Sequence, residues 1–283
     1  MSNATELSDR WRTNLESWAI PDEVLANSPE SPWVLPRQLF MRRAEFRLRA
    51  PTGPSFERAW EALEPPGSVL DVGSGAGTAC LPLLARATAV TAVDTDECLL
   101  SVLKDSADHL GTTAQAVLGR WPDVAGEVSP ADVVVCHHVF YNVADIEPFL
   151  TELTTHALRR VVAEMTAVHP LSFLNPLWER FWGIVRPSVP TAEDMLALLV
   201  ELGLDPSYEL WSPAGEPELQ SFDDLVEVTR RRLCLPPSRT AEVASALDEQ
   251  RRHEHHFGDP RAFGADLMTI WWSGTAQERH LSV

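Results

Sequence analysis

Short apolar runs alternate with amphipathic stretches along most of the chain. Runs such as "SVLDV" (68–72) and "ADVVVCHHV" (131–139) are rich in β-branched residues, and each is followed by a stretch with apolar residues three or four positions apart. The runs predict buried strands and the stretches predict helices. Because the two alternate, the sequence indicates an α/β fold: a Rossmann-like, doubly wound, mostly parallel sheet with helices on both faces.

This pattern assigns seven strands and the helices between them. The predicted strands cover residues 68–72, 89–94, 112–119, 131–139, 159–166, 207–213 and 265–274. The predicted helices cover residues 55–63, 77–86, 96–111, 146–158, 192–203, 221–234 and 239–253. Ligands of such sheets bind beyond the carboxyl ends of the strands, so we expect the functional residues in the loops that follow them.

Two parts of the chain depart from this alternation. Residues 1–55 are rich in tryptophan and proline and predict helices broken at Pro21. This segment cannot bury its own aromatic face, so we expect it to form a helical lid or cap on the α/β domain, residues 56–283. That domain has a predicted helical insert at about 168–190 and extra helices at about 221–253. The insert aromatics Trp178, Phe181 and Trp182 fit core packing or an apolar ligand pocket.

The composition restricts partners and compartment. The 283-residue chain has a net charge of −18, and its arginines are dispersed except at "RRR" (230–232), which fits an amphipathic helix face better than a phosphate site. Nucleic acids and anionic membranes need a basic surface, so both are disfavoured. The sequence has no run of ~18 apolar residues and no signal-peptide pattern. Its four scattered cysteines indicate free thiols and favour the cytoplasm. The oligomeric state stays open, a homodimer included.

A glycine-rich stretch, "LDVGSGAGT" (70–78), follows the first predicted strand of the sheet. Such a loop lets a ligand lie against the backbone, and a helix beginning there would offer its N–H groups to an anion. Asp94 ends the next strand, where a carboxylate can accept hydrogen bonds from both ribose hydroxyls of a nucleoside. The glycine spacing is G-x-G-x-G, which differs from the G-x-G-x-x-G of NAD-binding loops.

The spacing Asp71-x-Gly73-x-Gly75-x-Gly77 followed by Asp94 resembles the class I S-adenosylmethionine-dependent methyltransferases. "ADVVVCHHVFYNVADIEPFLTEL" (131–153) resembles their fourth strand, its loop and the next helix, and the resemblance covers roughly residues 56–165. It implies S-adenosylmethionine as cofactor, S-adenosylhomocysteine as product, and a small or medium-sized organic acceptor methylated at oxygen, nitrogen or carbon.

The resemblance also implies roles for individual residues. Asp71, Gly73, Gly75 and Gly77 would surround the methionine part of the cofactor, with His137 beneath it. Asp94 would hold the ribose hydroxyls with Thr95 beside it near the adenine. After the third strand, Trp121 either stacks on the adenine or plugs the space between loop and sheet, and Asp123 is an alternative adenine contact.

The reaction that the resemblance implies requires alignment of the acceptor and, for some acceptors, a base. His138 is the candidate general base because the pKa of histidine lies near neutrality. His137 is its neighbour, and strand alternation predicts that the two side chains point to opposite faces. Tyr141 and Glu164 are the other catalytic candidates; Glu164 contacts the acceptor, braces the N-terminal segment or pairs with an arginine. His169 follows it as a second polar group.

Several other interpretations compete with a methyltransferase. The cluster "HEHH" (253–256) suggests a metal site, but no second ligand set accompanies it, so we expect a solvated helix end and no metal. A cofactor-binding protein with a regulatory or structural role is an alternative function, because methyl transfer demands few diagnostic residues. An NAD-dependent oxidoreductase fits less well, since the glycine spacing differs and Lys104 is the only lysine, which excludes a Tyr-x-x-x-Lys pair.

Overall fold

The computed structural model describes residues 3–26, 28–33, 36–213, 221–253 and 266–275. Its strands are β1 (Gly67–Val72), β2 (Ala87–Asp94), β3 (Ala114–Leu118), β4 (Ala131–His137), β5 (Ala157–Thr166), β6 (Ser207–Trp211) and β7 (Leu267–Ser273). They form one sheet in the order β3-β2-β1-β4-β5-β7-β6. The pairs from β3 to β5 are parallel, and β7 is antiparallel to both neighbours. The predicted seven-stranded, mostly parallel sheet is confirmed.

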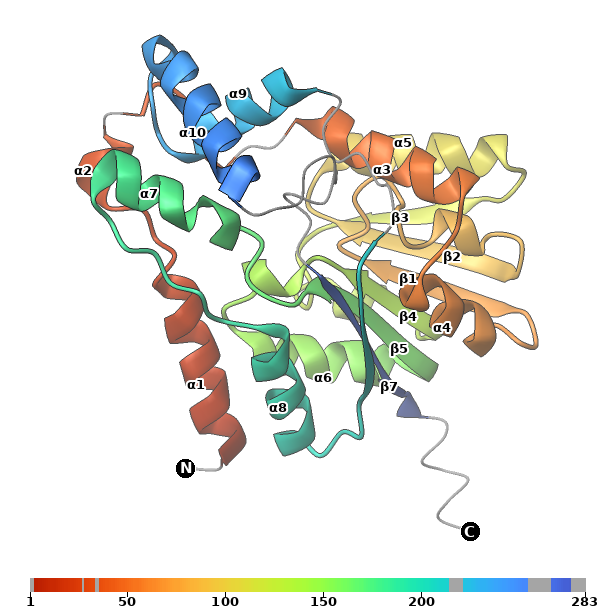
Figure 1. The fold of residues 1–283 in the computed structure, drawn as a ribbon. Helices are drawn as coiled ribbons and strands as arrows, with labels where there is room; N and C mark the ends of the chain where they lie inside the picture. Colours follow the sequence, from red (N-terminus) through yellow and green to blue (C-terminus); the bar gives the residue numbers. More distant parts are fainter. Residues whose placement is uncertain (1–2, 27, 34–35, 214–220, 254–265, 276–283) are drawn as a thin grey trace.

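Helices cover both faces of this sheet, as predicted (Figure 1). The helices are α1 (Asn3–Glu16), α2 (Asp22–Leu25), α3 (Arg37–Arg49), α4 (Pro54–Ala62), α5 (Glu97–His109), α6 (Ile146–His156), α7 (Asn175–Trp182), α8 (Ala192–Glu201), α9 (Phe222–Arg232) and α10 (Thr240–His253). On one face, α3, α4 and α5 share a buried cluster with β1 and β2. On the other, α1, α6 and α8 share a cluster with β4 and β5. Every helix in the described ranges is too short or too polar to span a bilayer.

The predicted helix over residues 77–86 is wrong. The chain forms turns there, with a single 3-10 turn at Leu81–Leu83. Gly77 has a left-handed φ of +92°, which is incompatible with the first turn of a helix. Pro82 has no N–H to donate within a helix. The glycine loop is therefore not followed by a regular helix N-terminus, and its ligand contacts must come from the loop itself.

A third buried cluster lies outside the two faces of the sheet. It joins α2, α7, α9 and α10, from three parts of the sequence, and we call these four helices the helical cap (Figure 1). Trp178 is buried in this cluster, where Phe181 and Trp182 also pack. The N-terminal segment 1–55 is thus divided: α1 packs on α6 and α8, α2 joins the helical cap, and α3 packs beside α5.

Candidate functional site

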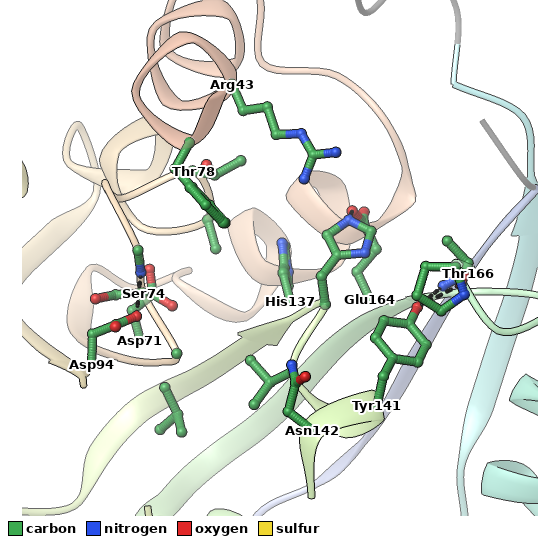
Figure 2. Close-up of a pocket in the computed structure, with 18 of the residues that line it drawn as sticks. Arg43, Asp71, Ser74, Thr78, Asp94, His137, Tyr141, Asn142, Glu164 and Thr166 are labelled. Carbon is green, nitrogen blue, oxygen red and sulfur yellow. Dashed lines mark hydrogen bonds and ion pairs between the residues drawn. The ribbon is translucent and has the colours of Figure 1, made fainter. Parts of the chain in front are cut away.

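A cavity of about 980 Å³ opens beyond the carboxyl ends of β1, β2, β4 and β5. This volume lies at the upper end of the roughly 300–1,000 Å³ found for small-molecule sites, so it has room for two ligands side by side. Polar side chains from the ends of these strands meet there, and Arg43 extends toward them from α3 (Figure 2). The cavity has two sides of different composition.

The first side, which we call the glycine-loop side, is formed by Asp71, Gly73, Gly75, Asp94 and Thr95. Gly73 has φ +74°, and an added Cβ would lie 2.3 Å from Cγ2 of Val139. Gly75 has φ +51°, and its added Cβ would meet only Phe40 of α3, at 3.8 Å.

These glycines serve different purposes. The space beside Gly73 is filled by the protein's own Val139, and the space beside Gly75 stays open to the cavity. Gly77 does not line the cavity, because its backbone packs closely against Leu81 and Leu103. Gly75 therefore leaves room for a ligand, whereas Gly73 and Gly77 allow the loop to pack against Val139, Leu81 and Leu103.

Asp94 joins the glycine loop to the end of β2. Its Oδ2 accepts a hydrogen bond from the Gly75 N–H at 2.7 Å, and its Oδ1 accepts one from the Asp96 N–H at 2.9 Å. Each carboxylate oxygen has two acceptor sites, so one site on each oxygen remains for a ligand. Backbone hydrogen bonds therefore fix this carboxylate at the cavity wall, with Thr95 beside it.

Two further polar groups lie behind the loop. Asp71 is 1% exposed, and its Oδ2 accepts a hydrogen bond from the Cys80 N–H at 3.2 Å. Burial raises the pKa of Asp71 to about 7. Ser74 lines the cavity, and its buried hydroxyl has no hydrogen-bond partner among the described residues. A buried hydroxyl without a partner carries a free-energy cost that a bound ligand removes.

The loop after β3 contributes Trp121. This side chain is 5% exposed, and its ring lies edge-on to His156 with centroids 4.9 Å apart. Its indole N–H donates to the carbonyl of Phe149 at 3.4 Å. Trp121 therefore packs between loop and sheet and also lines the cavity. Asp123 is exposed and lies outside the cavity lining.

His137 and His138 both line the cavity, so the prediction that they point to opposite faces is wrong. Strand alternation ends at His137, because His138 has a left-handed φ of +59°. Burial lowers the pKa of His137 to about 4, more than the nearby Glu164 charge raises it. His137 is therefore uncharged at neutral pH, and its buried Nε2 has no partner in the described structure.

Glu164 is held at the end of β5 by two side chains, His138 and Ser55. Its Oε1 lies 3.1 Å from Nε2 of His138, and its Oε2 accepts a hydrogen bond from the Ser55 hydroxyl of α4. Ser55 also hydrogen-bonds Thr269 of β7 at 2.7 Å. Within the described ranges its ion-pair partner is His138, not the arginine considered from the sequence.

Two opposing effects determine the charge of Glu164, which is 4% exposed. Burial raises its pKa, but the hydrogen bond with His138 and the nearby positive charges, Arg47 included, outweigh burial. They hold the pKa of Glu164 well below its usual range, so the carboxylate is ionised. The result is a buried carboxylate that fixes an adjacent imidazole.

Tyr141 lies near this pair. Its hydroxyl oxygen accepts hydrogen bonds from the backbone N–H of Thr166 and, at 2.8 Å, from the Thr166 hydroxyl (Figure 2). Burial raises the pKa of Tyr141 well above its usual value. The phenol therefore keeps its proton and can donate it in a hydrogen bond, but it is not a base.

The other side of the cavity, which we call the tryptophan side, is formed by Trp18, Trp33, His169, Phe173 and Arg232. The rings of Trp18 and His169 stack with centroids 3.8 Å apart and planes 16° apart. His169 thus contacts Trp18 instead of pairing with Glu164. Burial, with the charges of Arg186 and Arg232, lowers the pKa of His169 to about 3, so this ring is neutral.

Residues 69–160 match a family model described as a methyltransferase domain. The match runs from β1 to β5 and contains the whole glycine-loop side together with His137, His138 and Tyr141. No curated protein sequence matches the chain.

Solved structures share the fold of this chain. The YcgJ protein from Bacillus subtilis has a TM-score of 0.51 at 17% identity, covering 78% of this chain and 97% of its own. A cyclopropane-fatty-acyl-phospholipid synthase-like protein from Lactobacillus casei has a TM-score of 0.54 at 14% identity, covering 89% of this chain and 98% of its own. At these identities the similarity shows the fold alone, and the class I fold expected from the sequence is confirmed.

Several cavity residues lie outside the methyltransferase domain match or were not predicted. Ser74 and Thr78 line the cavity within the loop, and their place beside the glycines could have identified them. Ser55 hydrogen-bonds Glu164 although the two residues are 109 positions apart, so no local sequence pattern predicts this contact. The tryptophan side comes wholly from outside residues 69–160.

The metal interpretation falls mostly outside the described residues. His253 ends α10, and Glu254, His255 and His256 lie in a part of the chain that the structure does not describe. In the described ranges, no group of three or more His, Cys, Asp or Glu side chains is placed to hold a metal ion.

Proposed function

We propose that this protein transfers the methyl group of S-adenosylmethionine to a small organic acceptor and releases S-adenosylhomocysteine. The observation that carries the proposal is the Asp94 carboxylate, fixed by the Gly75 and Asp96 N–H groups at the wall of a cavity that continues past His138. A nucleoside on the glycine-loop side would leave the rest of the cavity for a second molecule. This arrangement supports transfer between two ligands bound together.

The residues of the glycine-loop side fit this cofactor. Asp94 has one acceptor site left on each oxygen for the two ribose hydroxyls, with Thr95 next to it. Gly75 leaves its side of the loop open, and the unpaired Ser74 hydroxyl offers a polar partner. We assign the methionine part to Asp71 and the loop, and the adenine to the region of Trp121. When bound, the cofactor supplies an electrophilic methyl group on a sulfonium that is a good leaving group.

The chain itself supplies a positioned base. If Nε2 of His138 donates its proton to the ionised Glu164, then Nδ1 carries the lone pair and can accept a proton from the acceptor. Glu164 is in this scheme a positioning residue. His137, uncharged at neutral pH, adds no positive charge that would repel the sulfonium. Tyr141 keeps its proton and would orient the acceptor by a hydrogen bond.

The N-terminal segment supports a lid over the cofactor. Phe40 of α3 faces Gly75, and the Arg37 Nε donates to Asp96 Oδ2 at 2.8 Å, next to Asp94. We assign this covering role to the cavity-lining part of residues 1–55, because α1 packs on α6 and α8, and we assign residues 56–283 to the catalytic part. The volume of the cavity and the net charge of −18 favour a small molecule over nucleic acid. Four free cysteines, three of them buried, favour a reducing compartment such as the cytoplasm.

Calorimetric titration tests this function. S-adenosylmethionine and S-adenosylhomocysteine should bind, and NAD should not. Asp94→Ala should weaken cofactor binding by about 2 kcal/mol or more, because two hydrogen bonds to a charged group are lost. Asp105→Ala, at an exposed position on α5, is the matched control and should leave the affinity unchanged. Binding of NAD in place of the two sulfur compounds would overturn the proposal.

A further inference from the structure

Arg232 is a cavity-lining arginine without an acidic partner. It ends α9, is only partly exposed, and makes no hydrogen bond or ion pair with the residues that the structure describes. Burial and the charge of Arg231 both lower its pKa, and no described carboxylate counters them. Partly burying a guanidinium without a counter-charge is unfavourable, so a group in the cavity would be expected to provide one.

The neighbouring arginines of α9 show the contrast. Arg230 is buried and its Nη2 lies 2.6 Å from Glu227 and 2.8 Å from Glu30. The Arg231 Nε lies 3.4 Å from the same Glu30. Two of the three consecutive arginines thus have acidic partners, and Arg232, which faces the cavity, has none. Arg230 and Arg231 are therefore structural ion-pair partners, and Arg232 alone of the three lines the cavity.

The surroundings of Arg232 are aromatic and carry no compensating negative charge. Arg186 is also buried without an acid; its guanidinium donates to the backbone carbonyls of Trp18 and Ala19 and lies over the Trp18 ring. His169 is neutral at physiological pH because its pKa is lowered to about 3. In a chain with a net charge of −18, Arg186 and Arg232 therefore bring two positive charges close to His169 on the tryptophan side, and Glu16 is the acidic residue that lines the cavity beside Trp18.

We propose that the methyl acceptor is an aromatic or apolar carboxylic acid whose carboxylate binds Arg232. This inference rests on the proposed methyl transfer and names its acceptor class. A guanidinium matches a carboxylate with two parallel hydrogen bonds, and the apolar body would lie against Trp33 and Phe173. One guanidinium balances one negative charge. A phosphate monoester carries nearly two at neutral pH, and Arg186 is already engaged with carbonyls, so a carboxylate fits better.

The test uses a matched pair of probes that differ in charge and hardly in shape: indole-3-acetate and indole-3-acetamide. Calorimetry on the full chain should show the carboxylate binding about tenfold more tightly than the amide, the scale of a charge-assisted pair. Arg232→Gln should abolish that preference. Arg232→Lys keeps the positive charge but loses the two parallel hydrogen bonds, so it should retain part of the preference for the carboxylate. This variant replaces Arg232→Gln in the test if Arg232→Gln does not fold. Arg231→Gln is the control on the same helix and should retain the full preference.

Three results would overturn the inference: equal affinity for the two probes, no measurable binding of either at millimolar concentration, or an unchanged preference in Arg232→Gln. Tighter binding of phenyl phosphate than of indole-3-acetate would also overturn it, by assigning the site to a phosphate. The probes are titrated without cofactor. A failure here is therefore distinguishable from a failure of the proposed function, which is read from binding of S-adenosylhomocysteine.

Discussion

The two sides of the cavity are built in opposite ways. The glycine-loop side comes from one continuous stretch, residues 71–95, in which backbone conformation and a few hydrogen bonds fix every group. The tryptophan side collects Trp18, Trp33, His169, Phe173 and Arg232 from segments far apart in the sequence. Its geometry depends on how the helical cap packs, because α2, α7 and α9 carry or adjoin these residues.

This difference separates two kinds of specificity. A cofactor shared by many reactions can be bound by a local motif, because its contacts are to backbone and to one carboxylate. An acceptor that differs between enzymes is bound by side chains on separate segments. Each of these side chains can be substituted without changing the structure of the glycine loop. We therefore expect substitutions on the first side to damage folding and cofactor binding together. On the second side, substitutions of exposed side chains such as Trp33 should change ligand preference with little effect on folding.

Gly73→Ala should produce the largest loss of stability on the glycine-loop side. The added Cβ faces a positive φ of +74° and a 2.3 Å approach to Cγ2 of Val139. We expect the free energy of unfolding to fall by about 3 kcal/mol, roughly 1 from the backbone and the rest from overpacking. Urea denaturation measures the change.

Gly111→Ala is the matched control for the backbone contribution. Gly111 has a φ of +78° and nothing within 4 Å of an added Cβ, so only the cost of about 1 kcal/mol should appear. Combining Gly73→Ala with Val139→Ala should recover part of the loss, since the two residues are in contact. If Gly73→Ala and Gly111→Ala lowered the unfolding free energy equally, the added Cβ at Gly73 would not clash with Val139.

Much of the fold and the first side of the site could be predicted from the sequence, because both depend on local patterns. Alternating apolar runs located the seven strands, and Asp94 was located by its position at the end of one of them. The wrong helix over 77–86 shows the limit of that method. Its apolar spacing is helical, but a left-handed Gly77 and a mid-segment Pro82 prevent the helical hydrogen bonds.

The rest of the site depends on contacts that no spacing encodes. His138 leaves the strand with a positive φ, so a rule of alternating faces placed it on the wrong side. Glu164 accepts a hydrogen bond from Ser55, which in turn hydrogen-bonds Thr269. Ser55 and Thr269 lie 109 and 105 positions from Glu164 in the sequence. The partner of a buried carboxylate is decided by tertiary packing. Arg232 likewise differs from Arg230 and Arg231 only through what surrounds it.

His137→Gln should change how stability depends on pH. In the unfolded chain this histidine protonates near its ordinary pKa of 6.5, whereas in the folded protein it protonates near 4. Because the unfolded state binds the proton first, folding stability is lost as the pH falls from 6.5 to about 4. Removing the histidine should spare the protein about 3 kcal/mol of that loss.

The measurement is the unfolding free energy of the variant minus that of the unmodified protein across this pH range. Asp71 acts in the opposite sense, because its pKa is raised to about 7 and the folded state takes up its proton first. It is present in both proteins and cancels in the difference. A flat difference for His137→Gln would mean that the His137 imidazole takes up a proton as readily in the folded protein as in the unfolded chain.

Trp33→Ala should have the smallest effect on stability, and it tests whether ligand preference and folding are separate on the tryptophan side. Trp33 is 50% exposed although it lines the cavity, whereas Trp18 is 5% exposed and donates its indole N–H to the Val189 carbonyl. Truncating Trp33 should therefore cost less than about 1 kcal/mol of unfolding free energy, and truncating Trp18 about 3 or more. Indole-3-acetate should nevertheless bind Trp33→Ala more weakly, because the acceptor loses an aromatic wall. If Trp33→Ala destabilised the fold as much as Trp18→Ala, Trp33 would be a packing residue, and the two sides of the cavity would not differ in the way proposed.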